Sequence, residues 1–210
     1  MPNAPEPFTG PVFALATRPP APNWYVMDRE DETVQIQLFI SPVDAILDGR
    51  IRAPEGGIDI IGIHNDMRVQ KNTTPTLHLA WRAHSGKLTL DAAGNLLPVT
   101  YGFSRGHGKS MNVVPDGTVL QTFSLIREMC GLYAWKETAR EFLFWHVDQQ
   151  TRAINRGLEV VQAGVRNSAE TFNQLAVFDP EFMQWHFVSV SDLSECLNAN
   201  GFQIYMDNWS

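Results

Sequence analysis

The chain of 210 residues has only two cysteines and no long uninterrupted apolar segment. Cys130 and Cys196 alone cannot form a disulfide framework, so a chain kept reduced inside the cell is the simpler interpretation. No apolar run approaches the ~20 residues needed to cross a bilayer. The start of the chain also lacks the basic and apolar stretches of a secretory signal. We therefore expect a cytoplasmic protein that makes no membrane contact.

Spaced metal-binding motifs are missing as well. The six histidines form no His-x-x-x-His pair, and no Cys-x-x-Cys occurs. Glu137 and Glu141 share one helix face, but neither is followed by the histidine that a di-iron helix motif requires. These carboxylates are predicted to form a solvated face, and His78 to be a solvent-facing strand residue. We expect no metal and no cofactor.

No catalytic nucleophile stands out. Cys130 lies on an apolar helical stripe, and Cys196 stands next to the acidic Glu195 rather than beside a cation that would activate it. A serine mechanism with His107 lacks the strand-turn-helix setting that exposes such a serine. The sequence therefore assigns no catalytic residue and favours a protein that is not an enzyme.

Charge is distributed unevenly along this acidic chain of net charge −7. Residues 1–49 carry a net −5, residues 50–110 a net +4, and residues 111–210 a net −6. An acidic protein repels phosphate, so binding of nucleic acid by the whole surface is disfavoured. A local anion site in the basic middle segment stays open.

The segment Gly102-Phe-Ser-Arg-Gly-His-Gly-Lys-Ser110 is the best candidate for that anion site. Glycines let backbone N–H groups approach an anion, and cations add attraction. The segment ends like a nucleotide-hydrolase loop, but Gly102 is one residue too far away and no helix is predicted to follow. It is either a surface loop or a phosphate or nucleic-acid contact, alone or as part of an enzyme site. The candidate anion-binding residues are Ser104, Arg105, His107, Lys109 and Ser110.

Prolines are concentrated at the start, where seven of the thirteen fall within the first 22 residues. Proline removes a backbone donor, so residues 1–23 are predicted to form an extended arm with at most an edge strand at 12–17. Residues 24–210 are predicted to form a single domain.

Alternating apolar residues indicate strands in the sheet-rich part, residues 24–114. The predicted strands cover 34–40, 58–63 and 77–82, followed by a hairpin whose strands at 87–90 and 95–101 flank a turn. Residues 43–47 are predicted to form a short helical segment. The sheet is expected to be mainly antiparallel.

Helical periodicity dominates residues 118–178. A capping box at Thr118 starts a helix whose stripe is Val119, Phe123, Ile126 and Cys130, and Gly131 breaks or kinks it. Further helices are expected at 132–161 and 167–178. A β-α-β unit at 184–206 completes an α+β fold, with strands at 184–190 and 202–206 around a helix at 192–199.

Aromatic residues crowd the segment 133–146 on more than one helix face. One apolar stripe cannot hold both Phe142 and its neighbours two and three residues on, so the helix is either buried on two sides or presents an aromatic patch. Our leading hypothesis is a non-enzymatic intracellular protein that binds a protein partner or a second copy of itself through this helix and the proline-rich arm. The candidate interface residues are Tyr133, Trp135, Phe144 and Trp145.

Overall fold

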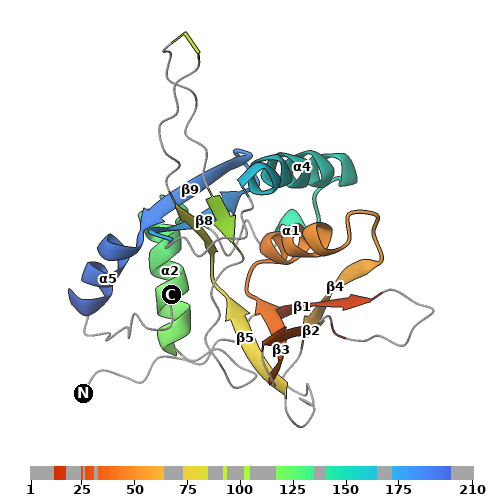
Figure 1. Ribbon diagram of the computed structural model, residues 1–210, viewed down its shortest axis with the longest axis horizontal. Coiled ribbons are helices and arrows are strands. Elements are labelled where there is room, and N and C mark those ends of the chain that lie inside the picture. The colour runs from red at the N-terminus through yellow and green to blue at the C-terminus, as the bar shows by residue number, and fades with distance from the viewer. Residues whose placement is uncertain are drawn as a thin grey trace.

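The computed structural model has an α+β fold in which two sheets are flanked by helices, as the sequence predicts (Figure 1). The structure describes residues 12–17, 25, 27–30, 33–63, 73–84, 92–93, 102–104, 117–134, 141–164 and 172–199. The predicted strand at 202–206, most of the predicted hairpin and most of the proline-rich arm lie outside these residues.

The first sheet comes from the N-terminal half of the chain. Its strands are β1 (Val12–Thr17), β2 (Met27–Glu30), β3 (Thr33–Phe39), β4 (Ile58–Ile63) and β5 (Thr73–His78). β1 pairs antiparallel with both β3 and β4, and β5 runs parallel to β3. The strand at 12–17 therefore exists, but the expectation of an edge strand is wrong. Residues 12–16 are buried, and their apolar side chains favour the interior of the sheet.

The second sheet has the order β7 (Gly102–Ser104), β6 (Trp81–His84), β8 (Gln174–Asp179) and β9 (Gln184–Ser189), all antiparallel. β9 confirms the predicted strand at 184–190. β8 corrects the predicted helix at 167–178, because residues 174–178 are extended. Residues 175–178 are all buried, so the strand lacks the polar alternation that would have identified it.

The two sheets are joined where the chain passes from β5 to β6. We expected one alternating strand at 77–82, but Leu79 and Ala80 separate two strands that belong to different sheets. The expectation that His78 faces solvent is also wrong. Its side chain is 1% exposed and packs between Phe39 and Trp81, with ring centroids 5.0 and 5.3 Å away. Both faces of the chain are covered where it passes from β5 to β6, so the alternation of apolar and polar residues does not distinguish buried from exposed positions there.

The described helices are α1 (Pro42–Arg52), α2 (Gly117–Met129), α4 (Val147–Gly164) and α5 (Val190–Ala199). α1 is longer than the helical segment predicted at 43–47, while α5 agrees with the helix predicted at 192–199. α2 ends as predicted, because Gly131 has a φ of 78° and closes a Schellman motif. In that motif the N–H of Leu132 donates to the carbonyl of Arg127 (2.7 Å), and the N–H of Gly131 to that of Glu128 (2.8 Å).

The continuous helix predicted at 132–161 is wrong, because residues 143–146 are not helical and α4 begins at Val147. The break separates aromatic side chains that one helix face could not hold. Phe142 is fully buried and packs against Trp145, with ring centroids 5.1 Å apart, whereas Phe144 is 88% exposed. The burial of Phe142 and the short turn after it thus override the helix propensity of residues 143–146.

The strand β8 divides the core into two parts. Leu175 and Val177 point toward a cluster that includes α2, α5 and the first sheet, and Ala176 and Phe178 point toward a cluster that includes α1 and α4. Figure 1 shows these two helix pairs on opposite sides of the second sheet. α1 also covers the first sheet, where its Ala45 joins a third cluster. α1 therefore contacts both sheets and borders the two surface features described next.

Candidate functional site

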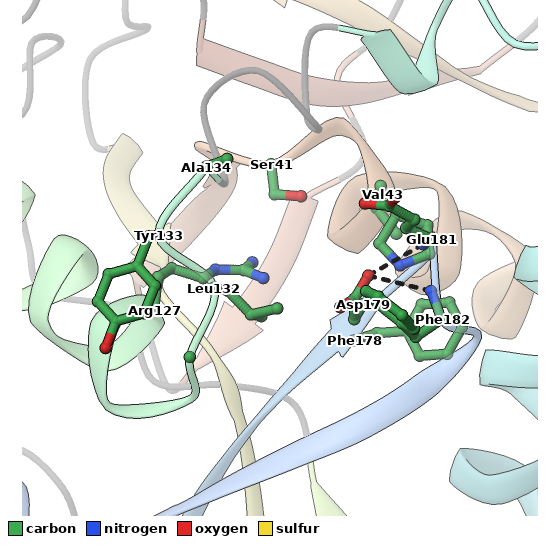
Figure 2. Close-up of a pocket in the computed structure, with 12 residues that line it drawn as sticks. Ser41, Val43, Arg127, Leu132, Tyr133, Ala134, Phe178, Asp179, Glu181 and Phe182 are labelled. Atoms are coloured by element: carbon green, nitrogen blue, oxygen red, sulfur yellow. Dashed lines mark hydrogen bonds between the residues drawn. The ribbon is translucent and has the colours of Figure 1, made fainter.

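A small pocket is formed by the N-terminus of α1, the C-terminus of α2 with the residues after it, and the turn between β8 and β9 (Figure 2). Its volume is about 130 Å³. An apolar cavity of about 150 Å³ is enough for one benzene ring, whereas sites for cofactors and drug-sized ligands occupy about 300–1,000 Å³. The pocket therefore admits a single side chain or a small organic group and excludes a nucleotide.

The pocket contains a buried cation, Arg127, in the last turn of α2. Its side chain is 6% exposed, and Nη2 donates a hydrogen bond to Oδ2 of Asp44 over 3.2 Å. The guanidinium also lies over the ring of Phe123, 5.0 Å from its centroid. Within the described part of the chain, Nε of Arg127 has no hydrogen-bond partner. Arg127 therefore has donor capacity beyond its bond to Asp44.

Burial changes the acidity of this pair. Removal from water raises the pKa of Asp44 to about 6, although the positive charge of Arg127 acts in the opposite direction. Burial likewise lowers the pKa of Arg127, while the carboxylates of Asp44 and Asp179 favour its charged form. The same environment raises the pKa of the Cys130 thiol to about 11, which agrees with an unreactive cysteine.

Asp179 forms the opposite wall of the pocket, at the end of β8. Its Oδ1 accepts hydrogen bonds from the backbone N–H groups of Glu181 and Phe182, at 2.9 and 3.4 Å (Figure 2). Its Oδ2 lies 3.5 Å from Nε2 of His186. The buried carboxylate thus fixes the turn that leads into β9, and Pro180 follows it as a turn residue.

Two aromatic side chains reach the solvent from this lining. Tyr133 follows α2 and is 78% exposed, and Phe182 belongs to the β8–β9 turn and is 69% exposed. Ser41 and Val43 add the beginning of α1 to the wall, where Ser41 occupies the N-cap position but makes no side-chain capping bond. The pocket thus combines an aromatic rim, a buried cation and an uncapped helix N-terminus.

A second, larger hollow runs along the other side of α1, between α1 and α4. It measures about 610 Å³, and its lining combines the aliphatic side chains of Ile46, Ile154 and Leu158 with polar and charged residues. The lining positions on α4 extend from Val147 to Glu159, which corresponds to about 18 Å of helix. The remaining lining residues are polar or lie at the ends: Arg50, Pro54, Gln150, Thr151 and Asn155. We call this feature the α1–α4 groove.

Exposed apolar side chains continue from one end of the α1–α4 groove. Val147 lines the groove and is 64% exposed, and the turn just before it exposes Leu143 (40%) and Phe144 (88%). Scattered exposed apolar residues are ordinary on a protein surface, whereas contiguous exposed apolar patches are the ones that typify interaction sites.

The structure separates the predicted interface residues. Tyr133 lies at the small pocket, Phe144 lies next to the α1–α4 groove, and Trp145 is partly buried against the core. Trp135 lies outside the described residues. Of the predicted anion-binding loop, Ser104 is the last residue of β7, while Arg105, His107, Lys109 and Ser110 fall outside the described part of the chain. The role of that loop stays a prediction.

Sequence reasoning missed the buried pair of Arg127 and Asp44, although both left a signal. Arg127 follows Phe123 by four residues, so a cation stands beside the apolar stripe of α2. Asp44 is likewise a single carboxylate within the apolar segment at 43–47. A charge at a core position is a sign of a buried partner, because an unpaired one would be costly.

No group of three or more histidine, cysteine or acidic side chains is arranged to hold a metal ion among the residues that the structure describes. None of the helices in the same part of the chain combines the length and apolar character that crossing a membrane requires. Comparison with known proteins adds no relative: the chain matches no known protein family, no curated protein and no solved structure.

Proposed function

We propose that this protein is a non-enzymatic binding or assembly protein that acts through protein–protein contacts at the α1–α4 groove. The observation that carries the proposal is the 88% exposure of Phe144, three residues before Val147, which lines the α1–α4 groove. Exposing such a ring costs about 1.5–3 kcal/mol relative to burying it. Aromatic residues are also the commonest anchors of protein interfaces.

The partner that fits this surface best is a second copy of the chain. A protruding aromatic turn lies next to a hollow, so two copies related by a twofold axis can each place Phe144 in the groove of the other. Arg50 on α1 and Glu159 on α4 lie on the same lining and carry opposite charges. A twofold arrangement that sets α1 of one copy against α4 of the other brings these charges together twice.

The size of the surface sets the expected affinity. The ten groove residues together with Leu143 and Phe144 make about half of the 20–30 residues that each partner contributes to a standard interface. We therefore expect a weak dimer with a dissociation constant in the micromolar range.

Sedimentation velocity over a range of micromolar concentrations tests the proposal. The wild-type protein should shift from monomer to dimer as its concentration rises. The Phe144→Ser and Val147→Asp variants should remain monomeric at the same concentrations. Aspartate at the first position of α4 also suits a helix N-terminus, so this change should disturb the interface without weakening the helix.

Phe182→Ser is the matched control, because it removes a comparably exposed ring from the other side of α1. It should leave the dimer intact. Arg50→Glu should weaken the dimer through repulsion from Glu159, and adding Glu159→Arg should restore it. A wild-type protein that stays monomeric throughout, or a dimer that Phe144→Ser leaves unchanged, would contradict the proposal.

A further inference from the structure

The small pocket contains a buried arginine, Arg127, whose hydrogen-bond donors are not all used within the described part of the structure. In the described part of the structure, the guanidinium of Arg127 makes a single hydrogen bond, to Asp44, and its Nε makes none. The side chain is nevertheless 94% buried, at the edge of a pocket large enough for a small organic group. A buried cation with unused donors calls for an acceptor, because leaving donors unsatisfied out of water is costly.

The N-terminus of α1 opens on the same pocket. Ser41 and Val43 line the pocket, Ser41 makes no side-chain capping bond, and the eleven-residue helix carries a partial positive charge at this end. Helix N-termini and arginine forks both favour a planar anion. Tyr133 and Phe182 at the rim offer an apolar surface for the remainder of a ligand.

We propose that this pocket binds a carboxylate group, which accepts hydrogen bonds from Arg127 beside the N-terminus of α1 and replaces Asp44 as the main charge partner of that arginine. The carboxylate belongs either to a small aromatic acid or to the C-terminus of a peptide chain, since both present the same planar anion. The pocket lies apart from the α1–α4 groove, so this inference does not depend on the dimer.

Binding is coupled to a proton. A second carboxylate beside Arg127 repels an ionised Asp44, so Asp44 takes up a proton when the ligand enters. The raised pKa of Asp44, about 6, keeps this step accessible near neutral pH. The ionisable groups around the pair all enter this balance: Arg127 and Cys130 from α2, Asp179 from β8, Glu181 from the turn and His186 from β9.

Benzoate is the probe, measured by calorimetry or ligand-observed NMR at about pH 5 and about pH 7.5. The wild-type protein should bind benzoate more tightly at the lower pH, by roughly 30-fold if only the protonated state of Asp44 is competent. Asp44→Asn should bind benzoate at the higher pH with nearly the low-pH affinity and should lose the pH dependence. A residue that only supported the fold would not produce this gain in affinity.

Tyr133→Ser and Phe182→Ser should each weaken benzoate binding, and both variants should fold like the wild type because the two rings are largely exposed. Phe144→Ser is the control and should bind benzoate like the wild type. Neutral benzamide and cationic benzylamine have nearly the shape of benzoate and should bind more weakly. A peptide that ends in phenylalanine, with a free or an amidated C-terminus, distinguishes the two sources of the carboxylate.

Tighter binding of benzylamine than of benzoate would overturn the proposal, because it would show that the acidic residues dominate the pocket. Failure of both benzoate and the free-acid peptide to bind at about pH 5 would overturn it as well. Neither result would test the proposed dimer. Conversely, a wild-type protein that binds benzoate but stays monomeric would support the carboxylate pocket and contradict the dimer.

Discussion

The small pocket and the α1–α4 groove both border α1, but their linings differ in chemistry. The pocket contains a buried ion pair, whereas the groove lining includes several aliphatic side chains. Asp44, on one side of α1, forms a buried ion pair with Arg127, whereas Ile46, two residues on, lines the α1–α4 groove. The pocket can distinguish ligands by charge and hydrogen bonding, since its polar atoms lie out of water. The groove instead offers aliphatic surface together with the charged side chains of Arg50 and Glu159 at its lining. The helix α1 thus borders both of the surfaces for which we propose a ligand.

The largest expected effect comes from removing the buried cation. Arg127→Met leaves the carboxylates of Asp44 and Asp179 without their positive neighbour, so we expect the free energy of unfolding to fall by about 3–5 kcal/mol. Urea unfolding followed by circular dichroism measures this loss.

Arg156→Met is the matched control on the groove side. Arg156 pairs with Glu159 over 2.7 Å, but the two side chains are 59% and 64% exposed. An exposed pair of this kind contributes only about 0–1 kcal/mol. Equal losses in the two variants would mean that burial does not separate the two regions.

The sequence predicts those parts of the fold that are determined by a local pattern of residues. β4 and β9 follow local patterns, and Gly131 stops α2 because only a residue that tolerates positive φ suits that position. β8 was mistaken for a helix, since a strand covered on both faces has no period to detect. The parallel pairing of β5 with β3 depends on contacts between distant segments, which local patterns do not encode.

The candidate sites were harder to predict than the fold. The pocket is assembled from residues 41–43, 127–134 and 178–182, which only the tertiary structure brings together. Sequence composition points to the aromatic segment, but it does not separate Phe142, which is buried, from Phe144, which is exposed. The turn that separates them arises from packing.

The second effect is a dependence of stability on pH that originates in the pocket. Asp44 has a folded-state pKa of about 6, above its usual value of 3.8. Between these values the folded state holds a proton that the unfolded state has lost. The contribution of Asp44 is therefore most favourable below about pH 4, declines as pH rises to about 6 and is then constant, a change of order 2–3 kcal/mol.

Urea unfolding of the wild type and Asp44→Asn across this range isolates the effect, because other carboxylates contribute equally to both proteins. The difference between the two curves should change between pH 4 and 6 and become flat above it. A constant difference across the range would show that Asp44 titrates like an exposed carboxyl group, and the proton-coupled step in the pocket would lose its basis.

We expect the smallest effect on stability at Phe144, on the groove side, and Phe142 in the same segment provides the contrast. Phe144→Ala should change the free energy of unfolding by less than about 0.5 kcal/mol, because its ring already lies in water. Phe142→Ala should cost about 3–5 kcal/mol, because its ring is fully buried. Urea unfolding at a concentration where the protein is monomeric measures both. A substantial loss of stability for Phe144→Ala in the monomer would mean that its ring supports the fold, so its exposure could not serve a partner.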